Sequence, residues 1–93
     1  MEKSFKQLIS LLSQDKLEYK HLEGLSQDYL TYYLNKLTEM MRLIEEGEKK
    51  VCEIDLIKLY YFRANVFAAM ALYKAALEDH KTICSLLIKE NPN

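Results

Sequence analysis

Apolar side chains recur every three or four residues along most of the chain, which is the spacing of one face of an α-helix. The first such run starts after Ser4, which stands three residues before Gln7 in the form of a capping box. The run predicts a helix over 4–22 that Gly24 ends. The residues of its apolar face are Phe5, Leu8, Ile9, Leu12, Tyr19 and Leu22.

A second run predicts a helix over 26–46, with Ser26 as its N-cap and Gly47 as its terminator. Its apolar face consists of Leu30, Tyr33, Leu34, Leu37, Met40, Met41 and Ile44. The charged segment 45–50 is expected to form the loop that follows. Within the helix, three tyrosines in five residues cannot all face one core. At least one of Tyr29 and Tyr32 is therefore expected to show its ring at the surface, and both are candidates to anchor a partner. The alternative is that their rings cover a small core.

Two apolar stripes follow one another in the segment 53–90. The first consists of Ile57, Tyr60, Ala64, Phe67 and Ala71, and the second of Met70, Tyr73, Leu77, His80, Cys84 and Leu87. Because the second stripe is displaced from the first by one residue, the pattern predicts a bend or a split around 69–73. A single unbroken helix is the alternative, since no Gly or Pro forces a break. Both stripes are expected to face the core, with Cys84 as a small buried residue.

The same segment carries an aromatic, small, aromatic, small pattern at Tyr60, Ala64, Phe67 and Ala76. These residues resemble the tetratricopeptide repeat, in which two helices approach at small side chains. The resemblance covers residues 57–92 only. It implies a helical hairpin at the C-terminal end of the chain.

The resemblance also implies a binding face on the first helix of that hairpin. In the repeat family, the positions of this face contact a bound peptide, and here they are Lys58, Tyr61, Asn65, Ala68 and Ala69. Asn65 matches the asparagine with which clamp-type repeats hold a peptide carboxylate. Tyr61 stands where those repeats carry lysine, so we expect its ring to stack on the partner and Lys58 to add a charge at the rim.

Composition favours one all-α domain over residues 1–93. The chain is 49% hydrophobic and 29% charged, and it has only two Gly and one Pro. We therefore expect three to four antiparallel helices in a small helical bundle with a hairpin that resembles the tetratricopeptide repeat. A net charge of −1 provides no basic field for nucleic acid or for anionic lipid. No segment has the form of a signal peptide or of a membrane span, so the cytoplasm is the expected location.

The sequence contains none of the motifs that mark common catalytic sites. It has no glycine-rich phosphate loop, no HExxH, no CxxC and no nucleophile elbow, so we expect no enzyme activity and no cofactor. A zinc site is the only chemical alternative. His80 and Cys84 are four residues apart on one helix face, and His21 with Cys52 would complete a set of two Cys and two His. A histidine that is hydrogen-bonded inside the core is commoner, so no metal is expected.

Two classes of function remain. The first is a small interaction module, an adaptor or a chaperone-like protein that binds a peptide or a helix of another protein. The second is a structural subunit that associates with itself in an obligate homodimeric helical bundle, because a chain this short buries only part of its apolar surface.

Overall fold

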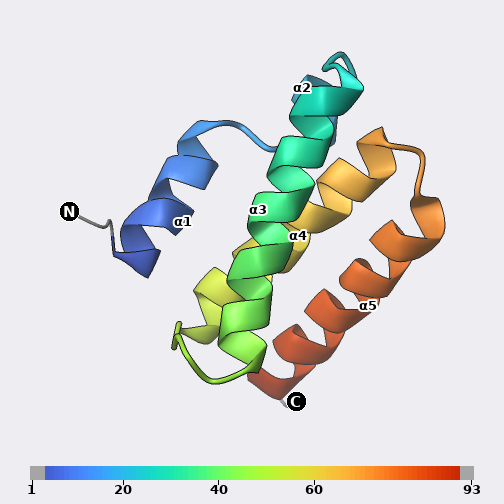
Figure 1. Cartoon of the computed structure of the whole chain (residues 1–93). Coiled ribbons are helices and arrows are strands. Elements are labelled where there is room, and N and C mark those ends of the chain that lie inside the picture. The colour runs from blue at the N-terminus through green and yellow to red at the C-terminus, as the bar shows by residue number, and fades with distance from the viewer. Residues whose placement is uncertain (1–3, 91–93) are drawn as a thin grey trace.

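The computed structural model describes residues 4–90, and all its regular secondary structure is helical, as Figure 1 shows. Residues 1–3 and 91–93 lie outside the described part. The helices are α1 (Phe5–Gln14), α2 (Tyr19–Leu22), α3 (Gln27–Glu45), α4 (Glu53–Ala69) and α5 (Tyr73–Glu90). The prediction of an all-α fold is confirmed. The number of helices exceeds the prediction because the first predicted helix is two separate helices.

The prediction of one helix over 4–22 is right at its start and wrong in its length. The Ser4 hydroxyl accepts a hydrogen bond from the Gln7 backbone N–H at 3.2 Å, and the Gln7 side chain accepts one from the Ser4 backbone N–H at 2.9 Å. This is the expected capping box. The helix ends at Gln14 because Lys16 adopts a left-handed conformation, with φ of 53°. Leu17 then turns into the core, where it is buried.

Helix α3 begins and ends within one residue of the prediction. Ser26 occupies the N-cap position with extended backbone, although its side chain makes no capping hydrogen bond. Gly47 has a φ of 78°. Its N–H donates to Ile44 O at 3.1 Å, and the next N–H, from Glu48, donates to Leu43 O at 3.0 Å. This pair of bonds is a Schellman motif, which requires a left-handed residue and so favours glycine.

The predicted split between the last two helices is confirmed, and the single unbroken helix is wrong. Ala71 has a φ of 63°. The Leu72 N–H donates to Phe67 O at 2.8 Å, and the Ala71 N–H donates to Ala68 O at 3.0 Å. The same Schellman motif therefore ends α4, here with alanine in the left-handed position. A left-handed alanine is strained, because its Cβ approaches the carbonyl that follows.

Helix α4 lies at the centre of the fold and packs against α5, α3 and α2. Figure 1 shows α3 crossing in front of α4, with α5 alongside. Leu37 on α3 and Leu59 and Val66 on α4 are fully buried where these helices meet. Ile9, Leu12, Leu17 and Leu22 close the core from the N-terminal side. The core is thus built mainly from the first four helices.

Candidate interaction surface

An ion pair fixes how α5 lies on α4. The Arg63 guanidinium donates two hydrogen bonds to the Asp79 carboxylate, from Nε at 2.8 Å and from Nη2 at 2.7 Å. The Asp79 side chain is only 5% exposed. Arg63 also lies 5.6 Å from the ring centroids of Tyr60 and Phe67. The hydrogen bonds with Asp79 raise the pKa of Arg63 above its usual value. A two-point contact of this kind defines one rotation of α5 about its axis.

This rotation turns most of the predicted second stripe away from the core. Within Tyr73–Lys89, small Ala76 and charged Asp79 are buried, and Ile83 and Leu86 are half-buried. Met70, before the helix, is half-buried against the core. The remaining residues of the stripe are exposed: Tyr73, Leu77, His80, Cys84 and Leu87. We call these five residues the α5 seam. The expectation that they face the core is wrong, and so is the expectation that Cys84 is buried.

Large apolar side chains are exposed mainly on the hairpin of α4 and α5. Among the residues described, seven of the twelve exposed large hydrophobic side chains lie between residues 54 and 88. They are Ile54, Tyr61, Leu72, Tyr73, Leu77, Leu87 and Ile88. Leu77 is 53% exposed and Leu87 is 47% exposed, although each has the spacing of a core residue. Contiguous exposed apolar patches mark interaction sites, and Tyr73, Leu77 and Leu87 share one face of α5.

The binding face predicted on α4 is only partly at the surface. Lys58 and Tyr61 are exposed. Ala68 and Ala69 are half-buried, and Ala69 packs against the core. Asn65 is buried, and its amide donates a hydrogen bond to the Leu17 carbonyl at 2.8 Å.

The expectation that the Asn65 amide faces a partner is therefore corrected. The turn between α1 and α2 places a carbonyl inside the fold, and the amide satisfies it. Contact of a partner with the other four residues of this face stays a prediction.

Tyr29 and Tyr32 are exposed, as expected, on a different helix. Together with Asp28 and Tyr33 they line a hollow of about 320 Å³ on α3. The Lys36 ammonium lies 5.5 Å from the centroid of the Tyr32 ring. Tyr33 is half-buried, and its pKa is raised by this burial, with a further contribution from the carboxylate of Asp15. The hollow contains no residue of α4, so the two predicted parts of the binding site do not form one pocket.

A groove between α1 and α3 was missed by sequence reasoning. It has a volume of about 410 Å³, and its lining includes Phe5 and Leu8 from α1 and Met40 and Leu43 from α3. The pattern placed Phe5 and Leu8 on the core face, and both are only half-buried. The short helix α1 rests on the core through Ile9 and Leu12 and leaves this edge open.

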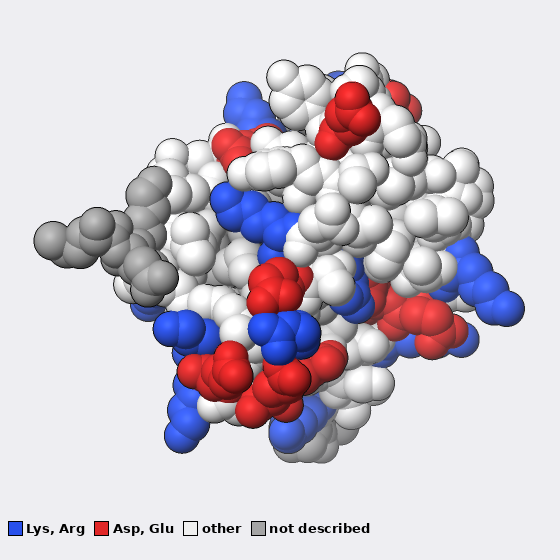
Figure 2. All heavy atoms as spheres, viewed as in Figure 1, with Lys and Arg blue, Asp and Glu red and all other residues white. Residues whose placement is uncertain are grey.

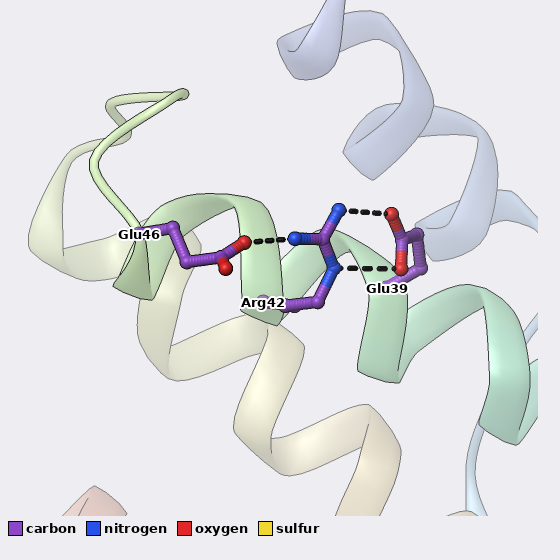
Figure 3. Close-up of polar contacts among 3 residues, drawn as sticks. All are labelled: Glu39, Arg42 and Glu46. Atoms are coloured by element: carbon purple, nitrogen blue, oxygen red, sulfur yellow. Dashed lines mark hydrogen bonds and ion pairs between the residues drawn. The ribbon is translucent and has the colours of Figure 1, made fainter.

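Charged side chains mark the solvent side of α3. Figure 2 shows acidic and basic groups close together over its C-terminal half. Arg42 donates to Glu39 from Nε at 3.0 Å and from Nη2 at 2.6 Å, and it also contacts Glu46, as Figure 3 shows. The hydrogen bonds from Arg42 lower the pKa of Glu39. These charged side chains are exposed and well hydrated, so this face is a poorer candidate for docking than the apolar seam.

The zinc ligands considered above do not meet inside one chain. Among residues 4–90, no three His, Cys, Asp or Glu side chains lie close enough together to hold a metal ion. His80 and Cys84 share the α5 seam, and the other two ligands, His21 and Cys52, lie on α2 and before α4. In the described part of the chain, no helix is long and apolar enough to cross a membrane.

Comparison of the chain with models of protein families, with curated proteins and with solved structures finds no match.

Proposed function

We propose that this protein is an interaction module that packs a helix of a partner protein against the α5 seam. The exposed seam is the observation that carries this proposal. Its residues are spaced by four, three, four and three positions, the spacing of the a and d positions in a coiled coil. A helix of the partner would bury the seam as a second helix does in such a pair.

The hairpin that carries the seam is held by contacts within the chain itself. The ion pair between Arg63 and Asp79 sets the rotation of α5, and the turn at Ala71 sets its direction. A rigid binding surface loses little conformational entropy when it binds. Burial of the exposed leucines then contributes about 25 cal/mol for each Å² of apolar surface removed from water.

The likeness to the tetratricopeptide repeat supports the same class of function. Ala64 and Ala76 are buried on the two helices of the hairpin, as small side chains are where repeat helices approach closely. The split also falls where the repeat has its turn. An adaptor or chaperone-like role in the cytoplasm is the form of this proposal that the composition favours. Tyr61 and Lys58 are exposed on α4, and contact of a partner with them is a proposal separate from the seam.

Self-association is the second candidate, and it uses the same surface. A second copy of the chain presents the same seam, so one unpaired stripe could cover another. In this case no other protein is needed.

Charge placed in the seam tests the proposal. Purified tagged protein is used to capture partners from native lysate, with Leu77→Asp as the test variant and Ser85→Asp as the matched control. Ser85 is exposed on the same helix but lies outside the seam. We expect one species, another protein or an untagged copy, to bind the wild type and Ser85→Asp and to be lost with Leu77→Asp. The same species is then reconstituted from purified components. Equal capture by all three proteins would overturn the proposal.

A further inference from the structure

We propose that the helix that covers the seam is α5 of a second copy, running antiparallel, and that the two copies together bind one zinc ion through His80 and Cys84 of each. This inference rests on the second form of the proposed function, in which the chain associates with itself through the α5 seam. It differs from the zinc site considered in the sequence, which drew all its ligands from one chain.

Two residues in the middle of the seam do not fit a purely apolar contact. His80 and Cys84 are both exposed, with Leu77 before them and Leu87 after them. Any helix that covers the leucines also covers the imidazole ring. A buried ring nitrogen without a hydrogen-bond partner or a metal costs free energy, so the covering helix must satisfy it. An apolar partner helix would not.

The spacing of these two residues is that of a pair of zinc ligands on a helix. Side chains four residues apart lie about 5–6 Å from one another on the same face, as do the two histidines of the HExxH motif. Structural zinc takes four ligands, commonly two Cys and two His. One chain supplies half of this set, and no third ligand lies nearby in residues 4–90. A two-fold axis supplies the other half.

One antiparallel alignment satisfies the leucines and the zinc ligands at the same time. In antiparallel pairs of helices, an a position faces a d position of the other helix. When Leu77 faces Leu87 of the second copy, His80 faces Cys84 of that copy, and the reciprocal contacts follow by symmetry. A shift by one heptad would place His80 against Leu77 and leave the imidazole without a partner. The favoured alignment encloses the four ligands between two pairs of leucines.

Charge is balanced in this arrangement. Each bound cysteine loses its thiol proton to solvent, so two thiolates neutralise one Zn²⁺. The charged residues that flank the seam are Lys74, Glu78 and Lys81. Lys81 approaches its own symmetry mate, but its ammonium already lies 3.4 Å from the Glu78 carboxylate of the same helix.

The size of the seam indicates that the metal is required. Helix α5 has 18 residues and is therefore ~27 Å long. A strip of this length covers roughly 300 Å², whereas a stable interface buries roughly 800 Å² on each partner. Apolar contact alone would give a weak dimer, so coordination must supply much of the association free energy.

The experiment uses the whole chain, reduced and stripped of metal with a chelator. Sedimentation velocity is recorded with and without added zinc sulfate, and bound zinc is measured by competition with a colorimetric chelator. We expect a monomer without zinc and a dimer with one zinc ion for two chains. Cobalt in place of zinc should give the visible absorption of a tetrahedral thiolate site. A cobalt spectrum of octahedral oxygen ligation would contradict the ligand set.

The chain offers a matched control for each ligand. Cys84→Ser and His80→Ala should abolish the zinc-dependent dimer, while Cys52→Ser and His21→Ala should leave it unchanged. All four side chains are exposed, so helical circular dichroism should stay at the wild-type level in every variant.

Three other results would overturn the inference, and each leaves a different account of the proposed function. A dimer that forms without zinc and resists Cys84→Ser would remove the metal but keep the pairing of the seam. A monomer under all conditions would remove the second copy, and the capture experiment with Leu77→Asp would still test a different partner. Zinc that binds one ion to each chain, or that is lost with Cys52→Ser, would be an adventitious ion only.

Discussion

The two faces of α5 contrast in a way that hydrophobicity does not predict. Its inner face buries a small alanine, Ala76, and an aspartate, Asp79, and it half-buries Ile83 and Leu86 further along. Its outer face exposes Tyr73, Leu77 and Leu87. Near the turn, the inner face can approach α4 closely because Ala76 is small and the charge of Asp79 is paired with Arg63. The outer face carries large apolar side chains of the kind found in a core. Within the described residues, they are exposed and not covered by another helix. We propose that the outer face is a second packing surface, which the isolated fold leaves open.

The largest difference between a core leucine and a seam leucine should appear in stability. Leu37→Ala should lower the free energy of unfolding by about 2–5 kcal/mol, because Leu37 is fully buried and leaves a cavity. Leu87→Ala in the metal-free protein should change it by less than about 0.5 kcal/mol. Urea denaturation followed by circular dichroism measures both. Similar losses for the two variants would show that α5 packs inward on both faces.

The ion pair should account for the next largest effect. Asp79→Asn removes the negative charge and one of the two acceptor oxygens that pair with Arg63, and it leaves a half-buried guanidinium without a counter-charge. We expect a loss of about 1.5–3 kcal/mol in the free energy of unfolding. The conservative Asp79→Glu variant keeps the charge but changes the geometry. It should lower the free energy of unfolding by less than Asp79→Asn does, but still measurably. An unchanged midpoint for Asp79→Asn would mean that the pair does not hold the inner face.

A smaller effect of opposite sign is expected at the turn between the two helices. Ala71→Gly should raise the free energy of unfolding by about 1 kcal/mol, because glycine adopts the left-handed conformation without strain. Ala75→Gly, inside α5, should lower it by about 0.5–1 kcal/mol. Thermal unfolding of the two variants side by side provides the comparison. Destabilisation by Ala71→Gly would contradict the Schellman turn.

The smallest effect is expected on the charged side of α3. Arg42→Ala removes contacts with Glu39 and Glu46, but all three side chains are about half exposed. Exposed pairs contribute about 0–1 kcal/mol. The change in the urea midpoint should be slight and should shrink further in added salt. A loss as large as that of Asp79→Asn would remove the distinction between paired charges inside and outside the hairpin.

Features that depend on neighbouring residues could be predicted from the sequence. The capping box at Ser4, the glycine turn at Gly47 and the split around Ala71 all arise from local patterns. The break at Lys16 could not be predicted, because lysine gives no signal for a left-handed conformation.

Contacts between distant residues account for the other errors. Arg63 and Asp79 are 16 positions apart, and Asn65 and Leu17 are 48 apart. The first contact sets which face of α5 is buried, and the second removes the Asn65 amide from the predicted binding face. The periodicity of α5 predicted a helix correctly, but it could not tell an inner apolar face from an outer one. Periodicity also misjudged the burial of Phe67. This residue lies in the middle of a predicted core stripe, but it is only half-buried, beside Arg63.

The reactivity of the two cysteines tests the central claim most directly, because one lies in the seam and the other does not. Cys84 and Cys52 are both exposed free thiols in the isolated chain. We expect both to react readily with a thiol reagent in the isolated protein. When the seam is covered, by zinc and a second copy or by a reconstituted partner, Cys84 should become protected while Cys52 still reacts, as measured by mass spectrometry of the labelled peptides. Equal reactivity of the two thiols in every state, native lysate included, would contradict the claim that the outer face of α5 is the interaction surface.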